Sequence, residues 1–444
     1  MRNLILRGSI VAACSLALAA CGGGSSSKRQ AYDDGGKERI TILTSTSDLR
    51  ADPSLVGQNV LVPAPYKNGV WTQAGGNTAH AVQHLALGNS LSLAWRADVG
   101  DGDRSYERMT TGPVSAEGKV FAMDVEGRIT AVNLATGRLV WQEEAEGISD
   151  RSDVGFGGGV AYADGLVVAT LGYGYVAAYA ADTGKQVWRY DALVPLRGAP
   201  TVADGRVFAL TQDNQTIALS LEDGEYLWDQ VGIAESAGML GAASPAYDGT
   251  ALVVALSSGE LTALLATNGQ GLWQDTLASS RRLTPLATLA DIDGAPVVAG
   301  GRVYAVSHAG SLVAIDMRTG ERSWEADIAS VNTPWIAGRF AYVVTIDGEV
   351  ACISLSDGRT KWVTQLQRFT NQQKRTGLVK WNGPVLAGDR LVVTSSHGYA
   401  LSVSPYTGEV ISGITLPAGT SLPSIVVDET LIIQTEKGEL LAYR

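Results

Sequence analysis

The sequence predicts an all-β fold, an eight-bladed β-propeller of four-stranded antiparallel blades. Three observations predict it: a unit that returns eight times between residues 110 and 444, short β-branched and aromatic runs between Gly and Asp, and no helical periodicity in these units. The fullest unit places a glycine, a small residue, a second glycine and a tryptophan at fixed offsets, as in Gly127, Ala131, Gly137 and Trp141. Repeats of about 40–50 residues that cannot bury a face alone must bury it against one another.

Within a unit, each feature predicts a part of one blade. Runs such as Arg206–Leu210 predict strands. The first glycine predicts a hairpin turn with positive φ, where Asn214 is the one replacement, and the second glycine predicts the next hairpin. The tryptophan is then expected in the outermost strand, packed between blades. A small residue recurs where we expect close contact between sheets, so that a larger side chain would overpack: Ala131, Ala178, Ala218, Ala263, Ala314, Cys352, Ser402 and Ala442.

The two ends of the repeat array predict how the ring closes. The seventh unit lacks the tryptophan, and the eighth stops at Ala442 without a fourth strand. A lone strand-like run, Ser92–Trp95, precedes the first complete unit, and we expect it to supply the missing strand. The propeller is therefore assigned to residues 91–444, with an N-terminal extension over residues 38–90 whose role stays open.

The N-terminus predicts export and lipidation. Residues 1–20 contain a charged start and an apolar run too short to span a membrane, which is typical of a signal peptide. Leu18-Ala19-Ala20-Cys21 resembles the bacterial lipobox, which implies that Cys21 is diacylated and begins the mature protein. Gly22 at the next position implies onward transport to the outer membrane, and residues 21–37 are expected to form a flexible lipidated tether.

Composition excludes several functions. The net charge is −11 and no run of basic residues is longer than two, as in Lys28-Arg29, so nucleic acid is not expected as a partner. Cys352 is the one cysteine left after processing and lipidation, so no internal disulfide is expected. It stands at the small position, which predicts a buried side chain.

No catalytic, cofactor-binding or metal-binding residue is predicted. The four histidines (His80, His84, His308 and His397) show no paired metal spacing, and the two in tight turns, His308 and His397, are expected to be ordinary solvated residues. Trp71, Trp335 and Trp381 lie outside the repeat register, and we expect them to pack in the core as well.

The run Ala314–Trp324 resembles the repeat of quinoprotein dehydrogenases, which bind pyrroloquinoline quinone and Ca²⁺ over the propeller centre. The same repeat occurs in the BamB family of lipoproteins of the outer-membrane β-barrel assembly machinery (BAM). The sequence resembles that family from Trp71 to the terminus, and its lipobox and size also agree. The chain lacks the adjacent cysteine pair of many quinoprotein dehydrogenases and shows no evident calcium ligand set, which favours the scaffold family.

The resemblance to the BamB family implies the contact residues for the barrel insertase, BamA. The family's Leu-Arg-Gly and Asp-x-Asp segments match Leu196-Arg197-Gly198 and Asp291-Ile292-Asp293, and Val194 stands where the family often has a second leucine. The implied function is a non-catalytic scaffold without cofactor, anchored by lipid on the periplasmic side of the outer membrane. Its implied partners are the insertase and other BAM subunits, and unfolded outer-membrane proteins are a further candidate partner through strand addition at blade edges.

Topology predicts that these segments share one rim. Both connect the fourth strand of one blade to the first strand of the next, at blades three and five. Because each blade has an even number of strands, all such connections emerge on the same rim, and we expect an exposed polar docking patch there. Two alternatives stay open: a quinone-dependent dehydrogenase of the periplasm, and a sugar- or peptidoglycan-binding propeller.

Overall fold

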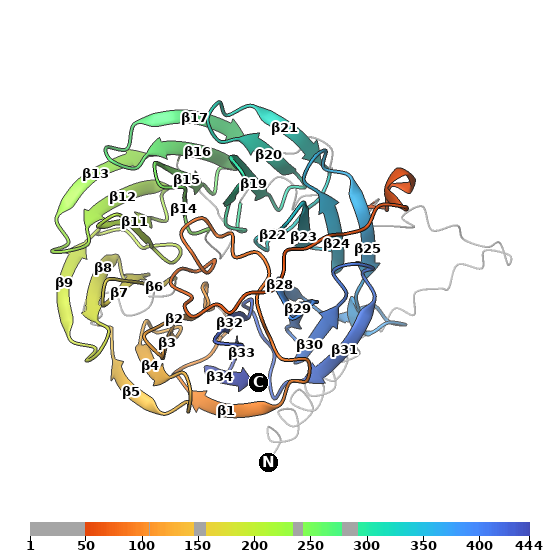
Figure 1. Cartoon of the computed structure of the whole chain (residues 1–444). Helices are drawn as coiled ribbons and strands as arrows, with labels where there is room; N and C mark the ends of the chain where they lie inside the picture. Colours follow the sequence, from red (N-terminus) through yellow and green to blue (C-terminus); the bar gives the residue numbers. More distant parts are fainter. Residues whose placement is uncertain (1–48, 106, 146–156, 234–242, 278–291) are drawn as a thin grey trace, which may run out of the picture. The chain divides into compact units, whose positions relative to one another are not determined.

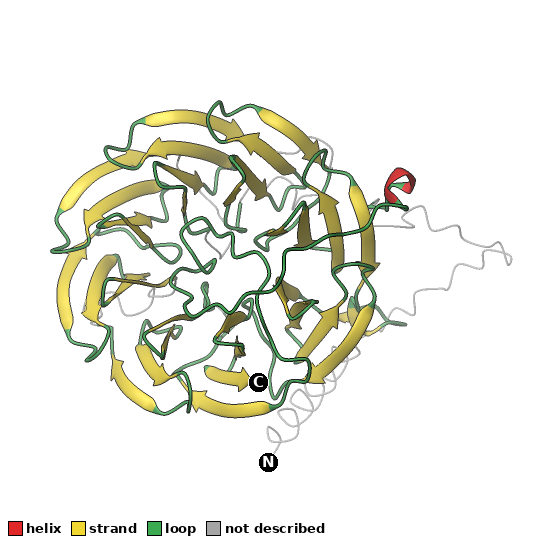
Figure 2. Cartoon of the chain, viewed as in Figure 1, coloured by secondary structure: helices red, strands yellow, loops and turns green. Residues whose placement is uncertain are grey.

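Eight four-stranded antiparallel sheets surround a central axis in the computed structural model (Figures 1 and 2), so the predicted eight-bladed propeller is confirmed. The structure describes residues 49–105, 107–145, 157–233, 243–277 and 292–444. Within these ranges the helical content is one short 3-10 helix, η1 (Pro53–Leu55).

Each of the first four blades is a meander of four strands in chain order. Blade 1 holds β2 (Val114–Ala116), β3 (Lys119–Met123), β4 (Ile129–Asn133) and β5 (Leu139–Glu143), and blade 2 holds β6 (Gly158–Ala163), β7 (Leu166–Leu171), β8 (Tyr175–Ala180) and β9 (Gln186–Asp191). Blade 3 holds β10 (Thr201–Ala203), β11 (Arg206–Leu210), β12 (Gln215–Ser220) and β13 (Tyr226–Val231), and blade 4 holds β14 (Ala246–Tyr247), β15 (Ala251–Ala255), β16 (Glu260–Leu265) and β17 (Gly271–Thr276).

The second half continues the pattern until the last blade. Blade 5 holds β18 (Val297–Ala299), β19 (Arg302–Val306), β20 (Leu312–Asp316) and β21 (Arg322–Ala326), and blade 6 holds β22 (Trp335–Ala337), β23 (Phe340–Val344), β24 (Glu349–Ser354) and β25 (Thr360–Gln365). A hairpin, β26 (Phe369–Asn371) and β27 (Thr376–Leu378), precedes blade 7, which holds β28 (Trp381–Ala387), β29 (Arg390–Ser395), β30 (Tyr399–Val403) and β31 (Val410–Thr415). Blade 8 holds β32 (Ile425–Val427), β33 (Thr430–Gln434), β34 (Glu439–Tyr443) and, from the other end of the chain, β1 (Leu93–Asp98).

Ring closure follows the prediction. Strand β1 pairs antiparallel with β34, with Trp95 opposite Ala442. Beyond the strands, Ser92 N donates to Arg444 O over 2.8 Å and Arg444 N donates back over 3.0 Å. The first and last strands of the propeller are therefore paired in one sheet.

The small repeat position has a reason that the sequence did not reveal. In blade 3, Ala218 pairs with Phe208 on one side and with Trp228 on the other. The two rings meet across it with centroids 5.9 Å apart, and the same aromatic pairs recur in blades 1, 5 and 6 at 5.9–6.1 Å. A side chain larger than Ala, Ser or Cys would hold these rings apart. Cys352 is fully buried at this position, as predicted.

Each repeat tryptophan locks its blade to the next one. The indole Nε1 donates to a backbone carbonyl of the following blade over 2.8–3.1 Å, in seven pairs: Trp95 to Leu134, Trp141 to Ala181, Trp188 to Leu221, Trp228 to Ala266, Trp273 to Met317, Trp324 to Leu355 and Trp362 to Pro405. The ring lies on the second glycine of that blade. A Cβ built on Gly224, for example, would lie 2.6 Å from Trp188 Cε3.

Residues 66–90, which we call the strap, cross the centre of the ring (Figure 1) and contact the first strand or first hairpin of every blade. The strap was not predicted. The hydrogen bonds, in blade order, are Ser115 N to Trp71 O (2.7 Å), Tyr162 N to Thr72 O (2.8 Å), Val202 N to Gln73 Oε1 (3.2 Å), Tyr247 N to Thr78 O (2.7 Å), Val298 N to Ala79 O (2.9 Å), Gly338 N to Gln83 Oε1 (3.1 Å), Leu85 N to Leu386 O (3.1 Å) and Asp428 N to Asn68 O (2.7 Å). The strap is therefore an integral part of the propeller.

The strap also buries two histidines. His80 and His84 are 4% and 1% exposed, a burial that the sequence did not predict. The Nδ1 atom of His80 lies 2.8 Å from Pro296 O, and that of His84 lies 2.7 Å from Pro63 O. Burial lowers the pKa of His80 to about 4. Trp71, Trp335 and Trp381 are buried as predicted, and Trp71 stacks on Trp335 with centroids 6.4 Å apart.

Candidate functional site

The predicted partner-binding segments lie on connections between blades. We call the face that bears these connections, together with the turns between second and third strands, the connector face. The strap contacts the ends of the first strands, where they turn into the second strands, so it marks the opposite side of the ring.

Leu196 and Arg197 lie in the connection from β9 to β10, but the structure does not expose them. Their exposed fractions are 1% and 7%. Arg197 N donates to Leu210 O over 2.9 Å and Gly158 N donates to Arg197 O over 3.0 Å, so the connection is held between blades 2 and 3. Leu196 packs in the apolar core of these blades. The surface of the connection is formed instead by Leu193, which is 73% exposed.

The remaining predicted contact residues differ in accessibility. Val194 is half-buried beside Leu193. Asp293 is half-buried in the connection from blade 4 to blade 5, directly after the fully buried Ile292. Asp291 and Cys21 lie outside the described residues. The structure therefore brings Val194, Leu196 and Arg197 together in one connection and places Asp293 in another.

Asp293 also lines a central cavity of about 480 Å³. The walls come from connections between blades and from the turns at Ser396 and Glu436, while Ala74 and Gly75 of the strap contribute from the other side. Charged side chains of both signs line this cavity: Arg108, Lys380, Asp293 and Glu436. The cavity could not be predicted from the sequence, because its lining residues belong to loops of different blades.

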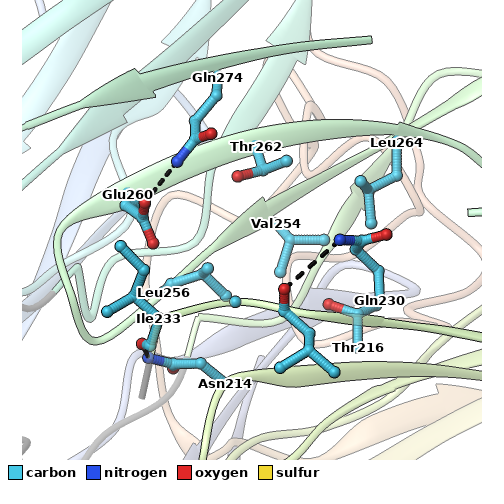
Figure 3. Close-up of a pocket in the computed structure, with 12 residues that line it drawn as sticks. Asn214, Thr216, Gln230, Ile233, Val254, Leu256, Glu260, Thr262, Leu264 and Gln274 are labelled. Atoms are coloured by element: carbon cyan, nitrogen blue, oxygen red, sulfur yellow. Dashed lines mark hydrogen bonds between the residues drawn. The ribbon is translucent and has the colours of Figure 1, made fainter. Parts of the chain in front are cut away.

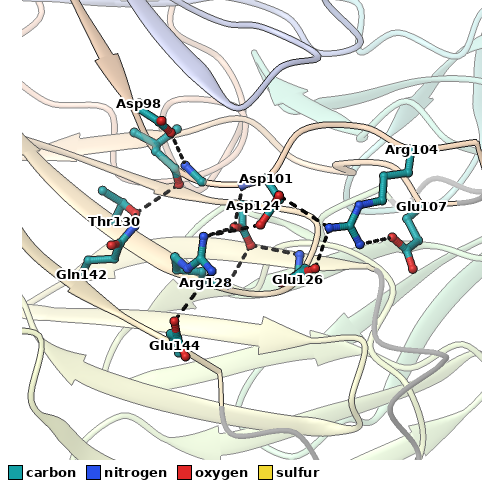
Figure 4. A network of polar contacts seen from close by, with 12 residues as sticks. Asp98, Asp101, Arg104, Glu107, Asp124, Glu126, Arg128, Thr130, Gln142 and Glu144 are labelled. Atoms are coloured by element: carbon teal, nitrogen blue, oxygen red, sulfur yellow. Dashed lines mark hydrogen bonds and ion pairs between the residues drawn. The ribbon is translucent and has the colours of Figure 1, made fainter.

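A polar network holds Arg108's segment in place (Figure 4). Arg104 forms ion pairs with Glu107 at 3.0 Å and Glu126 at 2.6 Å, which joins the connection into blade 1 to the turn between β3 and β4. Farther along, Met109 N donates to Asp103 Oδ1 over 2.8 Å, and Arg108 lies 3.6 Å from the other Asp103 oxygen.

Asp124 is the centre of that network. Its side chain is fully buried and accepts hydrogen bonds from the backbone N–H groups of Asp101, Glu126 and Arg128 over 2.8–2.9 Å. Burial raises the pKa of this carboxyl, while the hydrogen bonds and Arg128 oppose that shift. Since its acceptor sites are directed at the chain's own backbone, the role of Asp124 is to fix the loop rather than to react.

A second cavity of about 320 Å³ lies between blades 3 and 4 (Figure 3). Small or polar residues such as Thr216 and Thr262 line it, with Glu260 hydrogen-bonded to Gln274. At its border Val231 is 64% exposed and Ile233 is 59% exposed, at the end of the edge strand β13. This edge combines free backbone groups with apolar side chains, which suits pairing with an extended segment.

Two further properties concern metals and membranes. The described residues include no group of three or more His, Cys, Asp or Glu side chains arranged to hold a metal ion. No helix within the described ranges is both long and apolar enough to cross a membrane.

Comparison with known proteins decides the family. The model of the family described as outer membrane protein assembly factor BamB matches residues 71–150 and 125–364. The chain belongs to the BamB family. Assembly factor BamB of Shewanella oneidensis is 28% identical over 356 residues, covering 78% of this chain and 87% of the relative. BamB of Escherichia coli K12 is 27% identical over 353 residues, covering 78% of this chain and 87% of the relative.

Solved structures extend the likeness in fold. BamB from Moraxella catarrhalis superposes with a TM-score of 0.67 at 20% identity, covering 80% of this chain and 100% of that chain. A quinohemoprotein alcohol dehydrogenase from Pseudomonas putida HK5 superposes with a TM-score of 0.66 at 14% identity, covering 87% of this chain and 83% of that one. Identity at this level shows a shared fold, and the resemblance to the BamB family predicted from the repeats is confirmed by the family model.

Proposed function

We propose that this protein is a non-catalytic accessory lipoprotein of the outer-membrane β-barrel assembly machinery. The observation that carries the proposal is the match of residues 71–364 to the BamB family model, since the relatives are named outer-membrane protein assembly factors. The lipid on Cys21 would hold the ring at the periplasmic side of the outer membrane, where it acts as a rigid binding scaffold. The likeness to quinoprotein dehydrogenases extends to fold alone, so we do not propose a redox activity.

The docking surface for a BamA-type insertase is the connector face at blades 2 to 5. Leu193 and Val194 form its apolar part, and Leu196 and Arg197 support them from beneath. Asp293 adds an acidic group, and Asp291 is included from the sequence alone, so a partner segment with apolar and basic side chains would match this surface. Leu193 is 73% exposed and has a positive φ of 63°, a conformation that leucine rarely adopts, and this combination supports a role at the surface.

A pull-down of the tagged, lipidated protein from its own outer membrane tests the docking surface. We expect the insertase to co-purify with the unchanged protein and to be reduced at least tenfold with Leu193→Glu. Leu139→Glu is the matched control, because Leu139 is 61% exposed on β5 of another blade. Equal recovery with both variants would remove the β9–β10 connection from the interface.

The acidic part is tested by changing Asp291 and Asp293 together to Lys, which should weaken recovery of the insertase. Arg197→Glu should do the same, but Arg197 is only 7% exposed, so its circular dichroism and melting temperature must be measured alongside. Loss of the partner only in variants that also unfold would assign these residues to folding.

Unfolded outer-membrane proteins are the second class of partner. The edge strand β13 carries Tyr226, Leu227 and Val231, which are 50%, 44% and 64% exposed. An extended segment could pair with its free backbone edge and bury these side chains. Cross-linking from a photoreactive residue at position 227 should capture barrel substrates, whereas a residue at position 182, in a turn between strands, should not.

A further inference from the structure

The central cavity has the features of a built binding site. Ala74 and Gly75 of the strap line it at one side, so the channel through the ring is occupied there, and the remaining lining residues belong to the connector face. Its volume of about 480 Å³ lies in the range of small-molecule sites. Gly75 fixes the strap at this point, since a Cβ there would lie 2.5 Å from His80 Cδ2.

The charged groups of the cavity come from different parts of the ring. Arg108 precedes blade 1, Lys380 precedes blade 7, and Glu436 lies in a turn of blade 8 between them. Asp293 precedes blade 5, which is half a turn around the ring from blade 1. Burial and Asp103 raise the pKa of Glu436, whereas Arg108, His397 and Lys380 oppose that shift, so these groups share one electrostatic environment.

Backbone contacts fix the cationic side of the cavity. Lys380 N donates to Ser396 Oγ over 3.0 Å, and Ser396 N donates to Lys380 O over 3.0 Å. Asp103 N donates to Glu436 O over 2.8 Å. The positions of Lys380 and Glu436 are therefore set by the fold.

A buried polar atom points to a ligand. Ser244 lines the cavity and is only 2% exposed, yet its Oγ has no hydrogen-bond partner within the described chain. The hydroxyl of Ser421, a half-buried residue also in the lining, has no hydrogen-bond partner within the described chain either. A buried hydroxyl without a partner is unfavourable, and a bound polar molecule would supply the missing hydrogen bond.

We propose that the central cavity binds a small zwitterion of the amino acid or dipeptide class. Its carboxylate would lie near Lys380 and Arg108, and its ammonium would lie across the cavity near Asp293, with Ser244 as a hydrogen-bond partner. A simple anion would meet Glu436 and a simple cation would meet Lys380 without compensation. The described residues that line the cavity include no aromatic ring on which a sugar could pack, which disfavours a carbohydrate. The proposal does not depend on the role in barrel assembly.

Calorimetric titration of the full lipidated protein in detergent with L-alanyl-L-alanine tests this. We expect saturable binding that weakens at least tenfold when the dipeptide is N-acetylated and, separately, when it is C-amidated. Binding that survives either block unchanged would overturn the zwitterion assignment, and no heat with up to millimolar dipeptide would overturn the site.

Variants locate the binding. Lys380→Gln and Ser244→Val should each weaken dipeptide binding at least tenfold, the first by removing a charge and the second by filling space and removing the hydroxyl. Lys374→Gln is the matched control, because this exposed lysine lies in the turn between β26 and β27 outside the cavity. A melting temperature within two degrees of the unchanged protein would show that Lys380→Gln folds, and equal loss in the control would place binding elsewhere.

Discussion

Each blade packs against the next along an interface that we call a seam, and seven of the eight seams are held together differently from the eighth. In seven, a tryptophan of one blade donates to a carbonyl of the next and its ring covers a turn glycine. In the seam between blades 7 and 8, Ser412 occupies the tryptophan's register opposite Ser402. Blade 8 has no turn between its third and fourth strands that could receive a ring, because its fourth strand is β1, which precedes blade 1 in the sequence.

The strap provides the missing connection in that seam. Leu85 pairs with Ala387 of blade 7, and Asn68 and Lys67 contact Asp428 of blade 8, with the ion pair of Lys67 at 3.3 Å. Two passes of the strap are joined by Tyr66 N donating to His84 O over 3.1 Å. A repeat protein can therefore omit its repeated lock where a segment from outside the repeat takes its place.

The largest effect is expected from removing one tryptophan lock. Trp228→Ala should lower the free energy of unfolding by about 4 kcal/mol, because it loses buried area, a ring contact and a hydrogen bond. Ser412→Ala, at the same register on the exposed face of β31, should change it by less than about 0.5 kcal/mol. Urea unfolding measures both, and similar losses would contradict the difference between the seams.

The strap's contribution should depend on pH through His80. Its pKa is lowered from 6.5 to about 4, so the neutral ring is required in the folded state. The unfolded chain binds the proton first, so the stability from this group is present above pH 6.5 and is lost as the pH falls toward 4, up to about 3 kcal/mol. His80→Asn tolerates the local φ of 57° and removes the titration. Melting at several pH values should give a smaller slope for the variant, and parallel curves would refute the assignment.

Two turn glycines distinguish the contact with a tryptophan ring from the strain of a left-handed residue alone. Gly224 and Gly205 have φ values of 75° and 69°, but a Cβ on Gly224 meets the Trp188 ring while a Cβ on Gly205 has nothing within 4 Å. Both Ala variants share the cost of a left-handed residue, and Gly224→Ala should cost about 2 kcal/mol more. Equal unfolding midpoints for the two variants would show that the Trp188 ring can move away from the added Cβ at little cost in free energy.

The smallest effect is expected at the strap's contact with blade 8. Asn68 Nδ2 donates to Val426 O over 3.2 Å, so Asn68→Ala should cost about 1 kcal/mol. Hydrogen exchange should rise in β32 and β1 before it rises elsewhere. Asn89→Ala, at an exposed position of the strap, serves as the control and should leave exchange unchanged.

Features that recur in every blade could be predicted from the sequence, whereas features that occur once, such as the strap, could not. Register within the repeats was enough to predict the number of blades, the turn glycines, the closing strand and the burial of the tryptophans. Each of these features depends on a pattern that recurs from one unit to the next. The strap forms no continuous ladder, only single contacts with successive blades, so it has no alternating pattern to detect. The burial of Leu196 and Arg197 was missed for a similar reason: a short connection does not reveal that it folds back against Leu210.

The pairing of Ser92 with Arg444 also constrains the order of folding. Blades 1 to 7 consist of strands adjacent in sequence, so their hairpins can form as the chain emerges. Strand β1 must wait for β34, which follows the other strands in the sequence, and the loop between them spans the whole propeller. Until β34 is made, the edge of β1 stays unpaired, so chains truncated before this strand would be left as unclosed rings with exposed edges.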